Sequence, residues 1–183
     1  MNVTPELDSI FREAAIREGL VDVRYDVIDS PIGELLIAAT DRGLCRISYT
    51  VEGGDESLVR TFGVRVLRSP LDAVRRELDE YFEGRRRAFD LALDLRVAPF
   101  HEAVLRELAL VPYGRVETYG ALAAKVGRPR AARAVGTVMN RNPLPIVLPC
   151  HRIIGANGSL TGYAGGLDVK RALLQLEGAT LTL

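Results

Sequence analysis

The sequence is poor in the features that direct a chain out of the cell or into a membrane. Its 183 residues include only two cysteines, too few for the disulfide framework of a small secreted protein. No stretch approaches the roughly 20 apolar residues of a membrane-spanning helix, and the acidic, polar N-terminus lacks the basic start and apolar run of a secretory signal. Because 48% of the residues are hydrophobic, the chain can build a packed core. We therefore expect a soluble protein of the cytoplasm with no membrane partner.

The sequence also lacks the clustered cysteines and histidines of a structural metal site. Cys45 and Cys150 form no CxxC pair, and the two histidines, His101 and His151, complete no Cys/His cluster. We therefore expect neither a metal nor a cofactor. Cys45 lies in a segment that alternates like a strand, which favours a small buried side chain. Cys150 is followed directly by His151 and is the candidate for chemistry.

Basic residues are unevenly spread along the chain. Residues 1–97 carry 14 Lys/Arg against 19 Asp/Glu, whereas residues 98–183 carry 10 against 5. Between Arg115 and Arg152 there are seven basic residues and one acidic residue, Glu117. A local basic patch on a chain of zero net charge favours a polyanion on one face, although a solvated face balanced by the acidic half has the same composition.

Apolar periodicity predicts an α/β domain over residues 1–97. Alternating runs predict an antiparallel sheet of three strands, over residues 21–28, 34–39 and 43–50. Helical spacing of apolar residues predicts three helices, over residues 5–18, 57–62 and 71–82. Pro99, which suits the first turn of a helix, marks the boundary to a second domain over residues 98–183.

The second domain is predicted to be mostly helical, with helices over residues 99–110, 119–126, 130–140 and 167–177. Thr118 suits the N-cap of the second helix, and Gly127 and Pro129 break the chain before the third. Two short helices joined by such a turn make a helix-turn-helix. Small residues in its second helix permit close approach of a partner, which is either another helix or a DNA groove.

A proline-rich arm over residues 142–149 leads into Cys150 and His151. Three prolines within seven residues restrict the backbone, so the apolar arm should be rigid and buried. A thiol becomes a strong nucleophile as its thiolate, for which it needs a proton acceptor or a positive field. His151 is a candidate acceptor, directly or through a water, if an acidic residue holds its far ring nitrogen. Most Cys-His pairs are structural, so the dipeptide alone leaves both interpretations open.

Several motifs surround Cys150 in a fixed order. They are Val111-Pro112-Tyr113-Gly114, Thr118-Tyr119-Gly120, Ala132-Arg133-Ala134-Val135-Gly136, Asn142-Pro143, Pro149-Cys150-His151-Arg152-Ile153-Ile154, Gly162-Tyr163-Ala164-Gly165-Gly166-Leu167, Lys170-Arg171-Ala172-Leu173-Leu174 and Leu176-Glu177-Gly178. Together they resemble the O6-alkylguanine-DNA alkyltransferases, also called methylated-DNA–protein-cysteine methyltransferases, over nearly all of residues 98–178. The N-terminal half is similar more loosely, at Ser30-Pro31-Ile32-Gly33 and in the order of its elements.

The resemblance implies a fold and a reaction. The N-terminal domain would be ribonuclease H-like, and the C-terminal domain would be winged-helix-like and hold the site. The alkyl group on O6 of guanine, and on O4 of thymine, would pass to Cys150 and leave a thioether, so that each molecule acts once. The implied partner is double-stranded DNA containing O6-alkylguanine, bound by a monomer that needs no protein partner.

The resemblance also assigns roles to single residues. His151 would be the base, Glu177 would orient it, and Asn142 would support Cys150. Tyr119 would donate a hydrogen bond to guanine N3, because charge builds on the base as it becomes a leaving group. Arg133 would fill the space of the flipped nucleotide, since O6 lies on the base-paired edge and is out of reach inside a duplex.

Two surfaces complete the implied site. The DNA-binding surface would comprise Tyr119, Arg128, Arg130, Ala131, Ala132, Arg133 and Gly136. The substrate pocket would be lined by Met139, Pro145, Val147, Tyr163, Ala164, Gly165 and Gly166. The family commonly has a small polar residue in place of Ala164, and alanine removes that hydroxyl while leaving a backbone N–H that can bind O6. We therefore expect Ala164 to affect substrate range rather than activity.

Three other functions share part of this pattern. An alkyltransferase-like protein binds alkylated DNA without repairing it, but that group lacks the cysteine. A winged-helix regulator would explain the basic helix-turn-helix but not the Pro149-Cys150-His151-Arg152 motif. A Cys-His hydrolase would need an oxyanion site and would turn over repeatedly. Alkyl transfer to Cys150 is the function that we expect.

Overall fold

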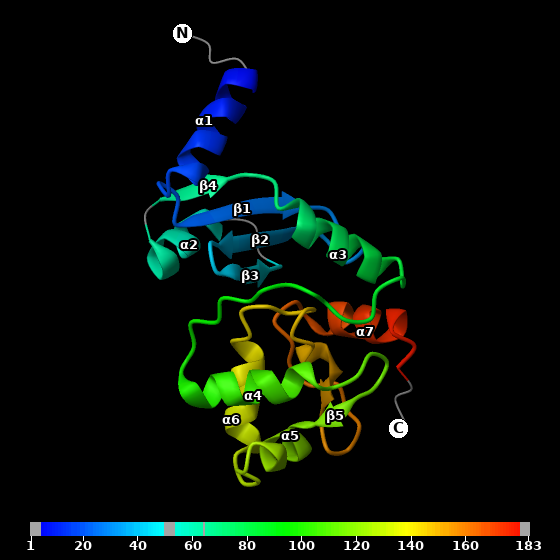
Figure 1. The fold of residues 1–183 in the computed structure, drawn as a ribbon. Coiled ribbons are helices and arrows are strands. Elements are labelled where there is room, and N and C mark those ends of the chain that lie inside the picture. Colours follow the sequence, from blue (N-terminus) through cyan, green and yellow to red (C-terminus); the bar gives the residue numbers. More distant parts are fainter. Residues whose placement is uncertain (1–4, 50–53, 64, 180–183) are drawn as a thin grey trace.

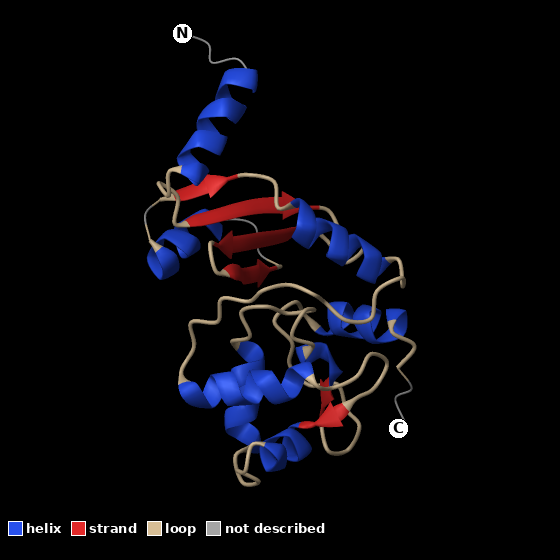
Figure 2. Ribbon diagram, in the orientation of Figure 1, coloured by secondary structure: helices blue, strands red, loops and turns tan. Residues whose placement is uncertain are grey.

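The computed structural model describes residues 5–49, 54–63 and 65–179, which form an N-terminal half built on a sheet and a mostly helical C-terminal half (Figure 1). The N-terminal half contains α1 (Pro5–Arg17), β1 (Val23–Ile28), β2 (Leu35–Thr40), β3 (Gly43–Ser48), α2 (Gly54–Phe62), β4 (Val66–Arg68) and α3 (Asp72–Phe82). The C-terminal half contains α4 (Pro99–Ala109), β5 (Glu117–Thr118), α5 (Tyr119–Lys125), α6 (Ala132–Asn140), the 3-10 helix η1 (Cys150–Arg152), β6 (Ile153–Ile154) and α7 (Leu167–Leu176). Figure 2 shows that most strand residues belong to the N-terminal half.

The main sheet has the strand order β3-β2-β1-β4. As expected, β1, β2 and β3 form an antiparallel meander, with Ile37 of β2 opposite Ile47 of β3. The sheet departs from the three-stranded prediction because β4 pairs in parallel with β1, where Val66 lies opposite Val23. With three residues, β4 is too short to show the alternation on which strand prediction depends. The predicted strand end at Thr50 lies outside the described residues.

Helices cover both faces of this sheet, so every residue of β2 is buried. Successive side chains of a strand point to opposite faces. Leu36 and Ala38 pack with Leu58 of α2 on one face. Ile37 lies on the other face, in the cluster that includes Leu78 of α3. The apolar run of β2 thus serves two separate packing surfaces.

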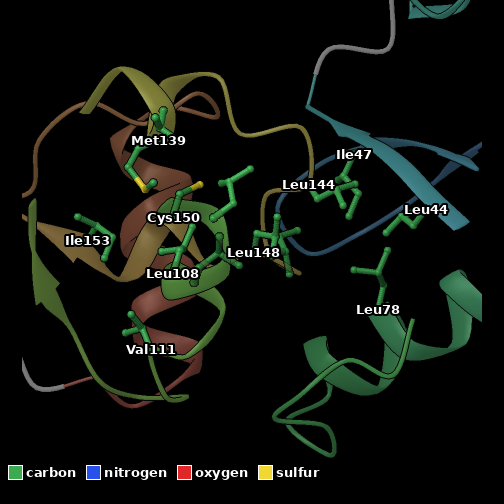
Figure 3. Packing of buried hydrophobic residues seen from close by; sticks show 14 of the residues in the cluster. Leu44, Ile47, Leu78, Leu108, Val111, Met139, Leu144, Leu148, Cys150 and Ile153 are labelled. Carbon is green, nitrogen blue, oxygen red and sulfur yellow. The ribbon is translucent and has the colours of Figure 1, made fainter. Parts of the chain in front are cut away.

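One apolar cluster joins the two halves (Figure 3). Leu144 and Leu148 of the proline-rich arm lie between the residues of the sheet half, such as Ile47 and Leu78, and the helices of the C-terminal half. The Ile47 N–H also donates to the Pro143 carbonyl at 2.8 Å. The arm that leads to Cys150 is therefore held against β3.

The predicted helix-turn-helix is formed by α5 and α6. The Thr118 hydroxyl accepts a hydrogen bond from the Ala121 N–H at 3.1 Å and caps α5, as expected.

In the part of the chain that the structure describes, no helix is long and apolar enough to cross a membrane.

The second helix of this motif begins later than expected, at Ala132 rather than Arg130. Arg130 and Ala131 belong to the turn, where the Ala131 N–H donates to the Arg128 carbonyl at 2.8 Å. The helical i→i−4 pattern starts only after this turn, with the Val135 N–H, which donates to the Ala131 carbonyl at 2.9 Å. The basic residues of the turn are consequently displayed ahead of α6 and not along it.

Candidate active site

Asn142 holds the proline-rich arm in a closed shape. Its Oδ1 accepts from the Leu144 N–H at 3.0 Å, and its Nδ2 donates to the Leu148 carbonyl at 2.7 Å. Between these contacts Ile146 has a φ of 76°, a left-handed backbone that is strained for a β-branched residue. The cross-linked arm ends at Cys150, the first residue of η1. The thiol is thus fixed by a short-range network.

Cys150 is almost fully buried, with 3% of its surface exposed. Burial raises the pKa of the Cys150 thiol because the thiolate loses its solvation, and the side chain of Asn142, the charge of Lys170 and the side chain of Tyr163 lower it by less. The resting thiol is therefore protonated and needs a base to become a nucleophile.

His151 is a buried base in a defined tautomer. Its Nε2 lies 2.8 Å from Glu177 Oε1. Because a carboxylate only accepts hydrogen bonds, Nε2 carries the proton and Nδ1 carries the lone pair. Among the described residues, Nδ1 is buried without a hydrogen-bond partner. Burial lowers the pKa of His151 despite the opposing effect of Glu177, so the ring is neutral at pH 7 and able to accept a proton.

Glu177 is the centre of a buried hydrogen-bond network. It was expected to be the last residue of a helix and instead follows α7 as its C-cap. Its Oε1 accepts from His151 Nε2 at 2.8 Å, from the Tyr81 hydroxyl at 2.7 Å and from Arg152 Nη2 at 2.9 Å. Its Oε2 accepts from Arg152 Nε at 2.9 Å and from the Gly114 N–H at 3.1 Å.

These hydrogen bonds decide the charge of Glu177. Burial by itself would raise the pKa of its carboxyl group, but the hydrogen bonds from His151 and Arg152 outweigh burial and lower the pKa from 4.5 to about 2. Glu177 is consequently ionised at neutral pH and fixes the orientation of the His151 ring.

The lowered pKa of Glu177 predicts a loss of stability in acid. A carboxyl group with a depressed folded pKa stabilises the folded state above its unfolded pKa, and this contribution, up to about 3 kcal/mol, is lost as the pH falls from about 4.5 towards 2. The difference in unfolding free energy between the wild-type and Glu177→Gln proteins should therefore narrow over that range. Urea unfolding at a series of pH values measures it, and a constant difference would contradict the prediction.

Tyr49, which follows β3, brings the N-terminal half to the predicted substrate pocket. Its hydroxyl lies 2.5 Å from the Tyr163 hydroxyl. Its ring packs so closely on Gly165 that a Cβ there would lie 2.9 Å from a ring carbon, so only glycine permits this approach. With Pro145 and Ala164, Tyr49 lines a cavity of about 300 Å³. Four of the predicted pocket residues therefore adjoin Tyr49: Pro145, Tyr163, Ala164 and Gly165.

The predicted DNA-binding residues of α5 and α6 lie around a second cavity, of about 370 Å³. Its lining residues are Tyr119, Ala132, Arg133, Gly136, Asn140, Thr161 and Gly162. The Tyr119 hydroxyl accepts a hydrogen bond from Thr161 Oγ1 at 3.1 Å. The guanidinium carbon of Arg128, in the turn before α6, lies 5.3 Å from the centre of the Phe100 ring.

Other predicted pocket residues lie in different surroundings. Figure 3 places Met139 next to Cys150, inside the apolar cluster. Val147 borders a separate cavity together with Tyr113. Gly166 is the N-cap residue of α7 and has a φ of 88°, which glycine adopts without strain.

Four residues that the structure brings to the site could not be assigned a role from the sequence: Tyr49, Tyr81, Arg152 and Lys170. Lys170 is fully buried, and its Nζ donates to the Ile153 carbonyl at 2.6 Å and to the Thr161 carbonyl at 3.0 Å. Burial lowers the pKa of Lys170 to about 8. Lys170 is one of only two lysines in the sequence, and this rarity was the one sequence feature that could have pointed to it. Tyr81 lies 96 residues from Glu177, and no feature of the sequence pointed to their contact.

Comparison with known proteins agrees with this arrangement. Residues 99–179 match the family described as 6-O-methylguanine DNA methyltransferase, DNA binding domain, and residues 23–95 match its ribonuclease-like domain. The methylated-DNA–protein-cysteine methyltransferase of Methanosarcina barkeri is 42% identical over 153 residues, which cover 84% of this chain and 96% of that protein.

Two solved structures from Mycobacterium tuberculosis are similar over most of their length. The O6-methylguanine methyltransferase has a TM-score of 0.77 at 40% identity, covering 85% of this chain and 93% of that one. OGT in complex with DNA has a TM-score of 0.76 at 40% identity, covering 85% of this chain and 92% of that one. The chain belongs to the 6-O-methylguanine DNA methyltransferase family, and the expected fold class is confirmed.

Proposed function

We propose that this protein repairs alkylated DNA by moving the alkyl group from O6 of guanine to Cys150, once per molecule. One observation carries the proposal: a buried thiol at the end of a cross-linked arm adjoins a neutral His151 that an ionised Glu177 orients. The names of the relatives, methylated-DNA–protein-cysteine methyltransferases, support the reaction. The DNA complex of the M. tuberculosis OGT supports DNA as the partner.

The proposed reaction assigns one step to each of four side chains: His151, Glu177, Cys150 and Tyr119. His151 Nδ1 takes the thiol proton, directly or through a bridging water, and Glu177 stabilises the imidazolium. The Cys150 thiolate attacks the alkyl carbon, so that an S–C bond forms and the C–O6 bond breaks with its electron pair left on guanine. Tyr119 donates a hydrogen bond to guanine N3 as this charge develops, and the proton taken from the thiol finally balances it. The resulting thioether is stable, so the protein is consumed.

The target base has to leave the duplex before this reaction occurs. Flipping a nucleotide costs a few kcal/mol, and a side chain that fills the vacated space offsets part of that cost. Arg133 is exposed on α6 at the cavity that Tyr119 lines, and is the proposed filler. The turn residues Arg128, Arg130 and Ala131, with Ala132 and Gly136 of α6, would face the DNA. O4-alkylthymine as a second substrate, a monomeric state and a cytoplasmic location belong to the same proposal.

Arg133→Ala should slow repair of an O6-methylguanine duplex on the order of tenfold or more, because the flipped state loses its filler. Reaction with the free base O6-benzylguanine, which needs no flipping, should stay near the wild-type rate. Single-turnover rates on the two substrates measure how much more the substitution slows repair of the duplex than reaction with the free base. Arg106→Ala is the matched control, since Arg106 is an exposed arginine of α4 that pairs with Glu102. Equal slowing on both substrates would remove the flipping role from Arg133.

The amount of repaired guanine tests the proposed function directly. With limiting protein and excess O6-methylguanine duplex, the guanine restored should level off at one per protein molecule. Affinity for the duplex should fall steeply with salt, because phosphate contacts release counterions. Continued turnover would indicate a hydrolase, and binding without repair would indicate a regulator.

A further inference from the structure

The N-terminal half reaches the Glu177 network through a buried hydroxyl. Tyr81, near the end of α3, donates from its hydroxyl to Glu177 Oε1 at 2.7 Å, and its side chain is fully buried. The same oxygen accepts from His151 Nε2 and from Arg152 Nη2. Tyr81 and His151 therefore compete for the electron density of one carboxylate oxygen.

Aromatic neighbours hold the Tyr81 ring in place. The centre of the Tyr81 ring lies 5.4 Å from that of Phe82, 5.5 Å from that of Phe89 and 6.1 Å from that of Tyr113. The angles between the ring planes are 70°, 39° and 79°, respectively. A ring packed on three sides keeps its hydroxyl aimed at the carboxylate. Burial raises the pKa of Tyr81, and the charge of Glu177 raises it further, so the hydroxyl remains a protonated donor.

We propose that Tyr81 is a positioning residue for the reaction at Cys150 and that it acts through Glu177 on His151. By donating to Oε1, Tyr81 withdraws charge from the oxygen that faces Nε2. This limits how strongly Glu177 stabilises the imidazolium, and so keeps His151 neutral and ready to accept the thiol proton. The N-terminal half is thereby part of the machinery that sets the strength of the base. This inference rests on the proposed role of His151 as that base.

The balance of charge around the His151–Glu177 pair explains why one hydroxyl matters. Among the described residues, Arg152, Lys170, Tyr81 and Tyr113 interact electrostatically with this pair, and Cys150 directly precedes His151 in the chain. Arg152 and Lys170 oppose a proton on His151, whereas Glu177 favours one. Tyr81 carries no charge, so its removal changes only the strength of Glu177 as a partner of the ring.

Tyr81→Phe tests the inference because it removes one oxygen and keeps the ring. We expect the pKa of the His151 imidazole, read by NMR, to rise by about half a pH unit or more. His101→Gln assigns the signals, since the chain has two histidines. In the pH profile of the alkyl-transfer rate, the acid limb should move to higher pH by the same amount. At pH values below the pKa of His151, transfer should therefore be about threefold slower.

Tyr113→Phe is the matched control for this substitution. Its hydroxyl donates to the Leu176 carbonyl at 3.2 Å and not to Glu177, and its ring touches the same aromatic group. It should move neither the pKa of His151 nor the acid limb. 3-Fluorotyrosine at position 81 is the opposite variant, because a more acidic phenol donates more strongly and should lower the pKa of His151.

The outcomes separate a positioning role from a packing role. An unchanged pKa of His151 in Tyr81→Phe, with or without a loss of stability, would overturn the inference, as would equal shifts in Tyr113→Phe. Should Tyr81→Phe fail to fold, the direction of the shift in the fluorotyrosine protein decides. A wild-type protein that transfers no alkyl group would refute the proposed function, whereas the NMR titration tests the link between Tyr81 and His151 without any activity.

Discussion

The Cys150→Ser protein is expected to lose alkyl transfer by about 10⁴-fold or more, the scale on which removing a nucleophile slows other enzymes. A serine hydroxyl is far harder to deprotonate than a thiol, and its base, His151, is already held neutral by burial. Binding to the duplex should persist, because Cys150 is buried and leaves the exposed face of α6 unchanged. Single-turnover transfer and a binding titration on the same O6-methylguanine duplex measure both effects.

Cys45→Ser is the matched control, because it makes the same replacement of a buried thiol by a hydroxyl at the other cysteine. Cys45 is also buried, but its Sγ–H donates to the Ala38 carbonyl at 3.3 Å inside the sheet, and burial raises the pKa of its thiol to about 12. Transfer by Cys45→Ser should remain at the wild-type level. If both substitutions abolished transfer, loss of fold rather than loss of the acceptor would be the explanation.

The Glu177→Gln protein is expected to show the second largest effect, on stability and rate together. The glutamine NH₂ cannot accept from Arg152 or from the Gly114 N–H, and the buried guanidinium loses its counter-charge. Breaking a buried pair from one side costs about 3–5 kcal/mol of unfolding free energy. Transfer should slow on the order of 10²-fold or more, because His151 loses the partner that fixes its tautomer.

Glu102→Gln is the matched control for the charge change. Glu102 pairs with Arg106 one turn along α4, and both side chains are exposed. A surface pair of this kind contributes about 0.3–0.5 kcal/mol, so the control should keep nearly all of its stability and rate. Urea unfolding compares the two variants. A Glu177→Gln protein as stable as the control would contradict the central place given to the Glu177 network.

Features that depend on neighbouring residues could be predicted from the sequence. The Thr118 cap, the start of α4 at Pro99 and the stiffness of the arm before Cys150 follow from the local preferences of threonine and proline. Motif order also identified His151 and Glu177 as a pair, 26 residues apart, through the family resemblance. A short segment such as β4 contains too few residues for such a pattern.

Contacts between the two halves could not be predicted in the same way. Tyr81 reaches Glu177 and Tyr49 reaches Tyr163 only because the sheet half packs on the arm and on α7, and the pairs are separated by 96 and 114 residues. Nothing in the sequence around either tyrosine distinguishes it from an ordinary core aromatic. The N-terminal half therefore contacts Glu177, the hydrogen-bond partner of His151, and Tyr163 of the predicted pocket, and neither contact could be predicted from the sequence.

The mass of the intact protein after incubation with an O6-methylguanine duplex tests the account most directly. Replacement of the thiol proton by a methyl group should add the mass of one CH₂ group, peptide mapping should locate it on Cys150, and the gain should stop at one per molecule. A protein that binds the duplex without gaining mass, or that carries the methyl group on another residue, would contradict the assignment of Cys150 as the alkyl acceptor.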